Sequence, residues 1–327
     1  MIRFLTGISL GALITWLAWV PLCRAWVPRV NGAHWFLDRA YEKKDAALRA
    51  SSSPKVVLVG ASSVAFGMRA PVLEQELRRP VVNYAGTAAL DVDFLLRRLV
   101  PELQAGDTVV LPLEHAFYGP GLRRSSLGLR AMAAIDQELG QSLVPRMNSR
   151  VAARTDPAWL VGSAPFDGAV LREIDEEISA SGDYINNDQP AAPGTEYAQN
   201  KIKYLGTPLG APNPEPLTSP LWDFIAEPVA ALQAKGVLLL AAHANYFDDP
   251  AYQTPEWTEF FESVEEGWRR QGVAMVGQAS DGFFPEELMW DSRSHVLESA
   301  AEDRARRLAA QLRPLLPVAP LSPLPPD

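Results

Sequence analysis

The chain is predicted to fold as an α/β protein, a flavodoxin-like three-layer sandwich with a five-stranded parallel sheet. Two observations predict it. Short, continuously apolar runs of the kind that form buried parallel strands recur along the chain, and segments with helical spacing of apolar residues separate them. Strands that alternate with helices form parallel sheets covered on both faces. The 327 residues are enough for one large domain with a mid-chain insertion.

An uncharged apolar segment opens the chain, and we interpret residues 4–23 as an uncleaved transmembrane anchor. At ~1.5 Å per residue this segment spans about 30 Å, the thickness of a bilayer core. No clean cleavage site of small residues follows it. The alternative is a buried core helix, but the segment is terminal and apolar on every face. Positive charges on its two sides nearly balance, so charge does not set the orientation.

A juxtamembrane connection over residues 24–53 contains one helix and leads into the α/β domain, residues 54–313. The first strand is predicted over residues 56–59, where four apolar residues precede a turn. The next elements are, in order, helix 71–77, strand 81–84, a helix around 94–100 and strand 108–113.

The regular pattern weakens between about residues 119 and 220, which we interpret as an insertion near the mouth of the site, partly helical over 131–143. The alternation then resumes, and the last elements are helix 221–234, strand 237–241, helix 256–270, strand 273–276 and helix 297–312. Six prolines make residues 314–327 an extended tail.

Composition excludes several classes of protein. The net charge of −9, without a recurring basic stripe, argues against a nucleic-acid binder. A single cysteine, Cys23, forms no internal disulfide. Histidines and acids lack metal-ligand spacing, so we expect no metal and no cofactor. A nucleotide binder on the same fold class is a weak alternative, because GASSVAFG lacks both the dinucleotide glycine pattern and a phosphate-binding lysine.

The stretch KVVLVGASSVAFG is the strongest candidate for chemistry. It places Ser62 in the first strand-to-helix turn, and reacting groups in open α/β sheets gather beyond the carboxyl ends of the strands. We therefore consider Ser62 a candidate nucleophile. The alternative is that Ser62 or Ser63 caps the helix that begins nearby.

A serine hydroxyl needs a base, and three of the four histidines, His115, His243 and His295, follow predicted strands. They should share one sheet edge with Ser62. His295 is the preferred base, because Asp291 precedes it in the same loop and can orient the imidazole. The alternatives for Asp291 are a helix cap or a pair with Arg293. The second candidate base is His115 beside Glu114, and other possible lining residues are Ser63, Asn83, His243 and Asn245.

These residues resemble the SGNH (GDSL-like) hydrolase superfamily. The similarity lies in GASSVAFG after a first strand, VVNYAG after a second, and a late aspartate and histidine before a terminal helix. More narrowly, the apolar anchor, GDTVVLPLEHAFY, GDYINN and WDSRSH resemble bacterial membrane-anchored members found with exopolysaccharide acetylation systems, relatives of the alginate and cellulose acetylation proteins. The resemblance covers most of residues 30–313.

The resemblance implies a role for each matching residue. Ser62 matches the nucleophile and one oxyanion donor, Gly86 the second donor, His295 the base and Asp291 its partner. Backbone N–H groups at both turns suit that role chemically. Two departures stand out. Glu114 occupies the place of an asparagine donor, and the Asp-to-His spacing is four where classical members have two or three.

The expected function is a serine acyl esterase or O-acetyltransferase that modifies a cell-envelope or secreted polysaccharide through an acyl-Ser62 intermediate. The resemblance implies a single-pass inner-membrane protein with a periplasmic domain and a membrane-bound acyl-transfer partner. Tyr118, Tyr246 and Trp290 are candidate sugar contacts, or ordinary core residues. The alternative, favoured by Glu114, is a catalytically degenerate scaffold or binding subunit of an exopolysaccharide complex.

Overall fold

The computed structural model describes residues 32–317, except 89, 120–131, 133–134, 143–176 and 186. The predicted anchor, much of the insertion and most of the tail therefore lie outside the described residues. No helix within these described ranges is long and apolar enough to cross a bilayer. The chain divides into two compact units, Met1–Ala40 with Arg124–Asp175, and Tyr41–Arg123 with Glu176–Asp327. In the first unit the structure describes the start of helix α2 (Gly32–Ala50) and helix α7 (Gln137–Ser142).

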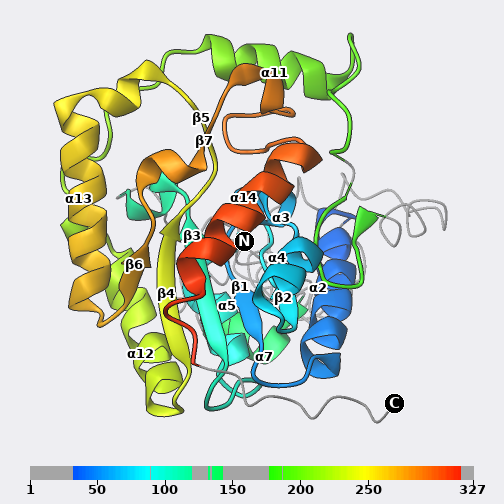
Figure 1. Cartoon of the computed structure of the whole chain (residues 1–327), viewed down its shortest axis with the longest axis vertical. Helices are drawn as coiled ribbons and strands as arrows, with labels where there is room; N and C mark the ends of the chain where they lie inside the picture. The colour runs from blue at the N-terminus through cyan, green and yellow to red at the C-terminus, as the bar shows by residue number, and fades with distance from the viewer. Residues whose placement is uncertain are drawn as a thin grey trace, which may run out of the picture. The chain divides into compact units, whose positions relative to one another are not determined.

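The second unit contains a five-stranded parallel sheet with the order β2-β1-β3-β4-β6, which confirms the predicted parallel sheet (Figure 1). In the register of the central strands, Val57 pairs with Val82 on one side and Val109 on the other. Every residue of β1, β2 and β3 is buried, because helices cover the sheet. The strands are β1 (Val56–Leu58), β2 (Val81–Asn83), β3 (Thr108–Leu113), β4 (Leu238–His243) and β6 (Ala274–Val276).

Helices pack in two groups. Helix α14 packs against α3 and α4, whereas α12 packs against α5, and α13 lies along β6 (Figure 1). The helices are α3 (Ser62–Gly67), α4 (Ala70–Leu77), α5 (Val92–Leu99), α12 (Leu221–Ala234), α13 (Pro255–Arg270) and α14 (Glu298–Leu312). Apolar side chains at helical spacing, such as Trp257, Phe260 and Val264 of α13, are the buried ones, as the sequence predicts.

Several elements were not predicted from the sequence. A second, two-stranded parallel sheet joins β5 (Tyr246–Phe247) and β7 (Phe283–Phe284) beyond the end of β4. Helix α11 (Glu196–Gly206) lies in the segment interpreted as an insertion. Short 3₁₀ helices are η2 (His115–Tyr118), η3 (Pro216–Thr218), η4 (Pro250–Gln253), η5 (Ala279–Gly282) and η6 (Glu286–Leu288). Strand β4 ends two residues later than the predicted strand 237–241, so His243 is its last residue rather than a residue beyond its end.

The GDYINN patch is fastened to the end of β2. Asp183 accepts hydrogen bonds from the Asn83 side chain at 2.9 Å and from Ala70 N–H at 3.1 Å. Lys44 of α2 donates to the Asn83 carbonyl at 2.8 Å, and burial lowers the pKa of this lysine to about 7. Buried polar groups need such partners, and together they hold this irregular segment in one conformation.

Candidate active site

Ser62 is the first residue of α3, the short helix that directly follows β1. The residue at the N-cap position is Ala61, which makes no side-chain cap hydrogen bond, so the alternative that Ser62 or Ser63 is the N-cap is wrong. Ser62 is partly exposed. Ser63 is fully buried, and its hydroxyl has no hydrogen-bond partner among the described residues. Ser62 is therefore the accessible hydroxyl of the pair.

Two buried asparagines donate side-chain hydrogen bonds to backbone carbonyls of α3. Asn83, the last residue of β2, donates to the Val64 carbonyl at 3.0 Å. Asn245, just after β4, donates to the Gly67 carbonyl at 2.8 Å and to the Ser63 carbonyl at 3.3 Å. The Gly67 carbonyl stands at the end of the helix, where it has no partner within the helix, and the Asn245 amide satisfies it. The Val64 carbonyl accepts the Asn83 amide in addition to Met68 N–H. Both asparagines were predicted to line the site, and in the structure their amides are hydrogen-bonded to α3, which we call the serine helix because it begins with Ser62.

Glu114 lies at the other end of α3. It directly follows β3, and its carboxylate accepts a hydrogen bond from Ser63 N–H at 3.3 Å. A negative charge near a helix N-terminus is favourable, because the first N–H groups point outward. The sequence placed Glu114 at the site, and the structure brings its carboxylate next to the residue that follows Ser62.

Asp291 and His295 form a hydrogen-bonded pair. Asp291 Oδ1 lies 2.7 Å from His295 Nδ1, and both side chains are largely buried. Asp291 is thus the partner of His295 and not of Arg293, which pairs with Asp249 at 2.8 Å. With Nδ1–H donating to the carboxylate, Nε2 of the neutral imidazole is the acceptor, which is the tautomer a general base needs.

A hairpin-like loop produces this pair despite its spacing of four. Trp290 N–H donates to the His295 carbonyl at 2.8 Å, and Met289 and Val296 form an antiparallel bridge. Inside the loop, Ser292 Oγ accepts a hydrogen bond from His295 N–H at 3.1 Å. The chain reverses within a few residues, so both ends of the loop face each other.

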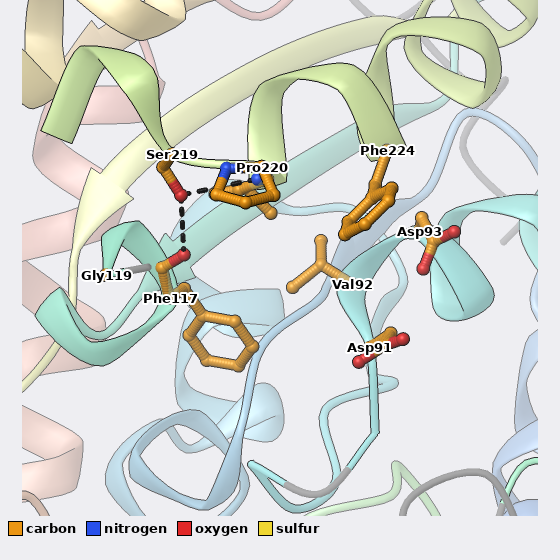
Figure 2. A pocket seen from close by; sticks show the side chains of 9 residues that line it. Asp91, Val92, Asp93, Phe117, Gly119, Ser219, Pro220 and Phe224 are labelled. Carbon is orange, nitrogen blue, oxygen red and sulfur yellow. Dashed lines mark hydrogen bonds between the residues drawn. The ribbon is translucent and has the colours of Figure 1, made fainter. Parts of the chain in front are cut away.

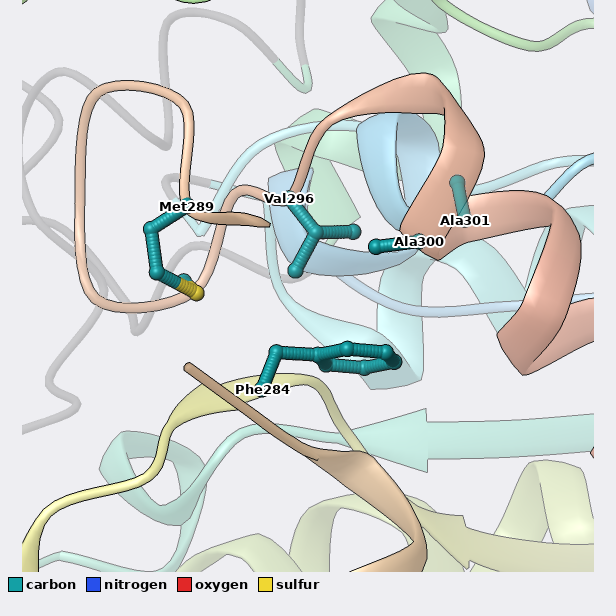
Figure 3. Packing of buried hydrophobic residues seen from close by; sticks show 5 residues of the cluster. All are labelled: Phe284, Met289, Val296, Ala300 and Ala301. Carbon is teal, nitrogen blue, oxygen red and sulfur yellow. The ribbon is translucent and has the colours of Figure 1, made fainter. Parts of the chain in front are cut away.

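The base of this hairpin is anchored in a hydrophobic cluster. Figure 3 shows the Met289 and Val296 side chains above the ring of Phe284, beside the start of α14. Met289 and Val296 are fully buried. The cluster consists of Phe284, Met289, Val296, Ala300 and Ala301. Burial of these side chains fixes the position from which Asp291 and His295 extend.

The hairpin and the serine helix meet through aromatic rings. The Phe66 ring lies 4.9 Å from the His295 ring, centroid to centroid. Phe66 is four residues after Ser62, so both project from the same side of α3. Ser62 and His295 were predicted to lie at one edge of the sheet, and in the structure the His295 ring contacts the helix that begins with Ser62. Within the described residues no hydrogen bond joins Ser62 Oγ to His295.

The other two histidines lie in different surroundings. The His115 ring packs 5.1 Å from Tyr246 and 5.3 Å from Trp257, and burial together with Arg293 lowers its pKa to about 4. The His243 ring packs 5.2 Å from Phe261. Neither histidine makes a hydrogen bond or ring contact to α3 among the described residues, so His295 is the only one of the three that these contacts bring to the serine helix.

The predicted oxyanion donors differ in availability. Gly86 N–H donates to the Gly60 carbonyl at 3.1 Å, so this amide is already engaged. Ser62 N–H stands at the first position of α3, and we see no acceptor for it in the described part of the chain. The first N–H groups of a helix lack intrahelical partners, which leaves Ser62 N–H as the donor that this site offers.

Beside the hairpin, Trp290, a candidate sugar contact from the sequence, packs with aromatic rings, and one of them, Tyr197, was not named from the sequence. Trp290 packs 5.1 Å from Phe66 and stacks on Tyr197 of α11 at 5.0 Å. Tyr197 is half exposed, whereas Trp290 is buried. Of the proposed sugar contacts, Tyr118 and Tyr246 are core residues with 2% exposure each. Tyr197 was not identified from the sequence, because the segment that contains it was interpreted as an irregular insertion.

A separate small pocket lies between the starts of α5 and α12 and the end of η2. Figure 2 shows Asp93, Phe117 and Phe224 around it, with Ser219 Oγ 3.4 Å from the Phe117 carbonyl. None of the predicted site residues lines this pocket. Among the residues that the structure describes, no group of three or more His, Cys, Asp or Glu side chains lies close enough to hold a metal ion.

No family model matches the chain, and no curated protein matches it. Among solved structures, the chain is similar to the X-ray crystal structure of protein YXIM from Bacillus subtilis, with 12% identity and a TM-score of 0.37. The similarity covers 81% of this chain and 57% of that chain, so this chain spans a little over half of that protein's length. A similarity at this level carries no argument about fold or activity.

Proposed function

We propose that this chain is a serine acyl esterase or O-acetyltransferase of the SGNH (GDSL-like) type on a flavodoxin-like three-layer sandwich. The observation that carries the proposal is the Asp291–His295 hydrogen bond of 2.7 Å on a hairpin whose histidine ring packs 4.9 Å from Phe66, one helical turn after Ser62. The strand order β2-β1-β3-β4-β6 and the two groups of helices support the sandwich.

In the proposed reaction, Ser62 Oγ attacks the acyl carbonyl while His295 Nε2 takes the hydroxyl proton. Asp291 holds the imidazole through Nδ1–H and stabilises its positive charge. The tetrahedral intermediate then releases the alcohol, which takes the proton back from His295. In the second half, water or a sugar hydroxyl attacks acyl-Ser62 while His295 Nε2 takes its proton, and the departing Ser62 Oγ takes that proton back. Water gives the free carboxylic acid, and a sugar hydroxyl gives an O-acetylated sugar. Ser62 N–H would donate to the developing oxyanion.

The substrate and location follow from the resemblance and the apolar first segment. We propose a cell-envelope or secreted polysaccharide as substrate, a single-pass anchor over residues 4–23 in the inner membrane, and a periplasmic domain. A membrane-bound acyl-transfer protein is the proposed partner. The half-exposed Tyr197, stacked on Trp290, adds an apolar ring next to the hairpin that suits a sugar face.

A second candidate is a catalytically degenerate scaffold or binding subunit of an exopolysaccharide complex. Two contacts favour it. The Glu114 carboxylate is bonded to α3 where a neutral donor would serve an oxyanion better, and Gly86 N–H is engaged by Gly60. A scaffold needs the fold and the surface but no reactive serine.

Fluorophosphonate labelling of the full chain tests the first proposal. We expect mass spectrometry to locate the label on Ser62, and Ser62→Ala to abolish both labelling and acetyl-ester hydrolysis. Ser63→Ala is the matched control, because that hydroxyl is buried without a partner among the described residues. Equal rates of ester hydrolysis by the wild type and Ser62→Ala would contradict the proposal of a serine enzyme and would favour the scaffold or binding subunit.

A further inference from the structure

We propose that Asn187 is a positioning residue that sets the distance between the serine helix and the histidine hairpin. The inference rests on the proposed function and assigns a role to the last residue of GDYINN, to which the sequence analysis gave none. Asn187 is fully buried. It belongs to the irregular segment that follows Asp183, and its amide lies between two stretches of chain that carry the reacting side chains.

Both amide hydrogens of Asn187 are used, and they go to different segments. Nδ2 donates to the Phe66 carbonyl of α3 at 3.0 Å and to the Val296 carbonyl of the hairpin at 2.6 Å. Oδ1 accepts from Arg69 Nη2. The orientation of the amide is determined by these partners, because a flipped amide would set its oxygen against two carbonyl oxygens.

Each bonded carbonyl is close to a reacting group along the chain. Phe66 lies one helical turn after Ser62, and Val296 directly follows His295. One side chain therefore joins the backbone beside the nucleophile to the backbone beside the base. Asn83 and Asn245 also hold α3, but their side-chain bonds do not reach the hairpin.

Asn187 and its partner Arg69 make further contacts with the chain around them. Arg69 donates to the Tyr184 carbonyl at 2.6 Å, and its Nε lies 3.3 Å from Glu298 Oε1. The Asn187 carbonyl accepts from Glu298 N–H at the start of α14, at 2.9 Å. Removal of the amide leaves two buried carbonyls without this donor, and buried polar groups without partners are costly. The hairpin and α3 then lose the link that holds them at one separation.

Kinetics in the full chain test this role. We expect Asn187→Ala to lower kcat for an activated acetyl ester roughly 10- to 100-fold with KM within about twofold, because small misplacements of reacting groups cost rate rather than binding. In the His295→Ala background the same change should have no further effect on acylation of Ser62, since Asn187 acts through the position of His295. An equal fold-loss in both backgrounds, or no loss in either, overturns the proposal.

A conservative variant helps to distinguish a loss of positioning from a loss of folding. Serine at this position keeps one donor for two carbonyls, so Asn187→Ser should fall between wild type and Asn187→Ala in kcat. Circular dichroism at the assay temperature confirms that the variants are folded, and a drop in kcat that tracks only the unfolded fraction contradicts a positioning role.

A second readout does not depend on activity. Nuclear Overhauser contacts between the Phe66 and His295 rings, 4.9 Å apart by centroids, should be present in the wild type and weakened or lost in folded Asn187→Ala. Unchanged contacts overturn the inference. If Ser62→Ala hydrolyses the ester as fast as wild type, the proposed function fails, and this ring contact still decides whether Asn187 sets the separation.

Discussion

At the scale of single residues, Glu114 is where the site departs most from what acyl transfer requires. Its carboxylate accepts a hydrogen bond from Ser63 N–H at 3.3 Å, next to Ser62 N–H, the oxyanion donor in the reaction that we propose. A negative charge beside a developing oxyanion raises the barrier by Coulomb repulsion. The same charge stabilises the start of α3. Glu114 therefore favours the folded helix at the expense of the proposed chemistry.

We expect Glu114→Gln to raise kcat/KM for a neutral acetyl ester about tenfold, or about 1–2 kcal/mol in transition-state stabilisation. The glutamine oxygen can still accept Ser63 N–H, and its amino group can donate to the oxyanion. Steady-state kinetics on wild type and variant measure the change. Glu286→Gln is the control, because it removes the same charge from an exposed position. A lower rate in Glu114→Gln would mean that the carboxylate contributes to the reaction.

At the scale of elements, the hairpin that carries Asp291 and His295 depends on its anchor. Met289 is completely buried in the cluster with Phe284 and Val296. We expect Met289→Ala to lower the free energy of unfolding by about 2–4 kcal/mol, because it removes apolar contacts and leaves a cavity. Urea denaturation of the full chain measures this cost. Leu288→Ala, at a partly buried neighbour, should cost less. An equal or smaller cost for Met289→Ala would show that the cluster does not anchor the hairpin.

The elements also show what the sequence can predict. Continuous apolar runs located the five parallel strands, because strands that helices cover on both faces consist mostly of apolar residues. Helical spacing of apolar residues located helices between them. Helix α11 was missed because it lies between residues 119 and 220, which we interpreted as an insertion that is helical only over 131–143. Strands β5 and β7 are two residues long each, too short for any period to be visible.

The site was predictable where its residues are neighbours in the sequence. Asp291 and His295 occupy one loop, so their pairing could be expected from sequence alone. The contact of the His295 ring with Phe66 of α3 depends on long-range packing that no local pattern records. Asn187 illustrates the limit, because its amide bonds reach residues 121 and 109 positions away along the chain.

At the scale of the whole molecule, two buried histidines make stability depend on pH. Burial, with Arg293 nearby, lowers the pKa of His115 to about 4. Burial and Arg304 lower the pKa of His243 to about 4, against an opposing effect of Asp281. The unfolded chain takes up these protons near the ordinary pKa of about 6.5. Between pH 6.5 and 4 the unfolded state therefore binds more protons than the folded state, and stability falls as pH falls.

As pH falls from above 6.5 to below 4, each of the two histidines lowers the free energy of unfolding by about 3 kcal/mol. We expect the free energy of unfolding of the wild type, from urea denaturation, to fall more steeply between pH 6.5 and 4.5 than that of the double variant His115→Leu/His243→Leu. The absolute stability of the variant does not matter, because the comparison is between slopes. All other side chains are the same in the two proteins, so their contributions to the two slopes cancel. Parallel slopes would show that the two imidazoles take up protons over the same pH range in the folded and the unfolded chain. Water would then reach the aromatic side chains that surround them.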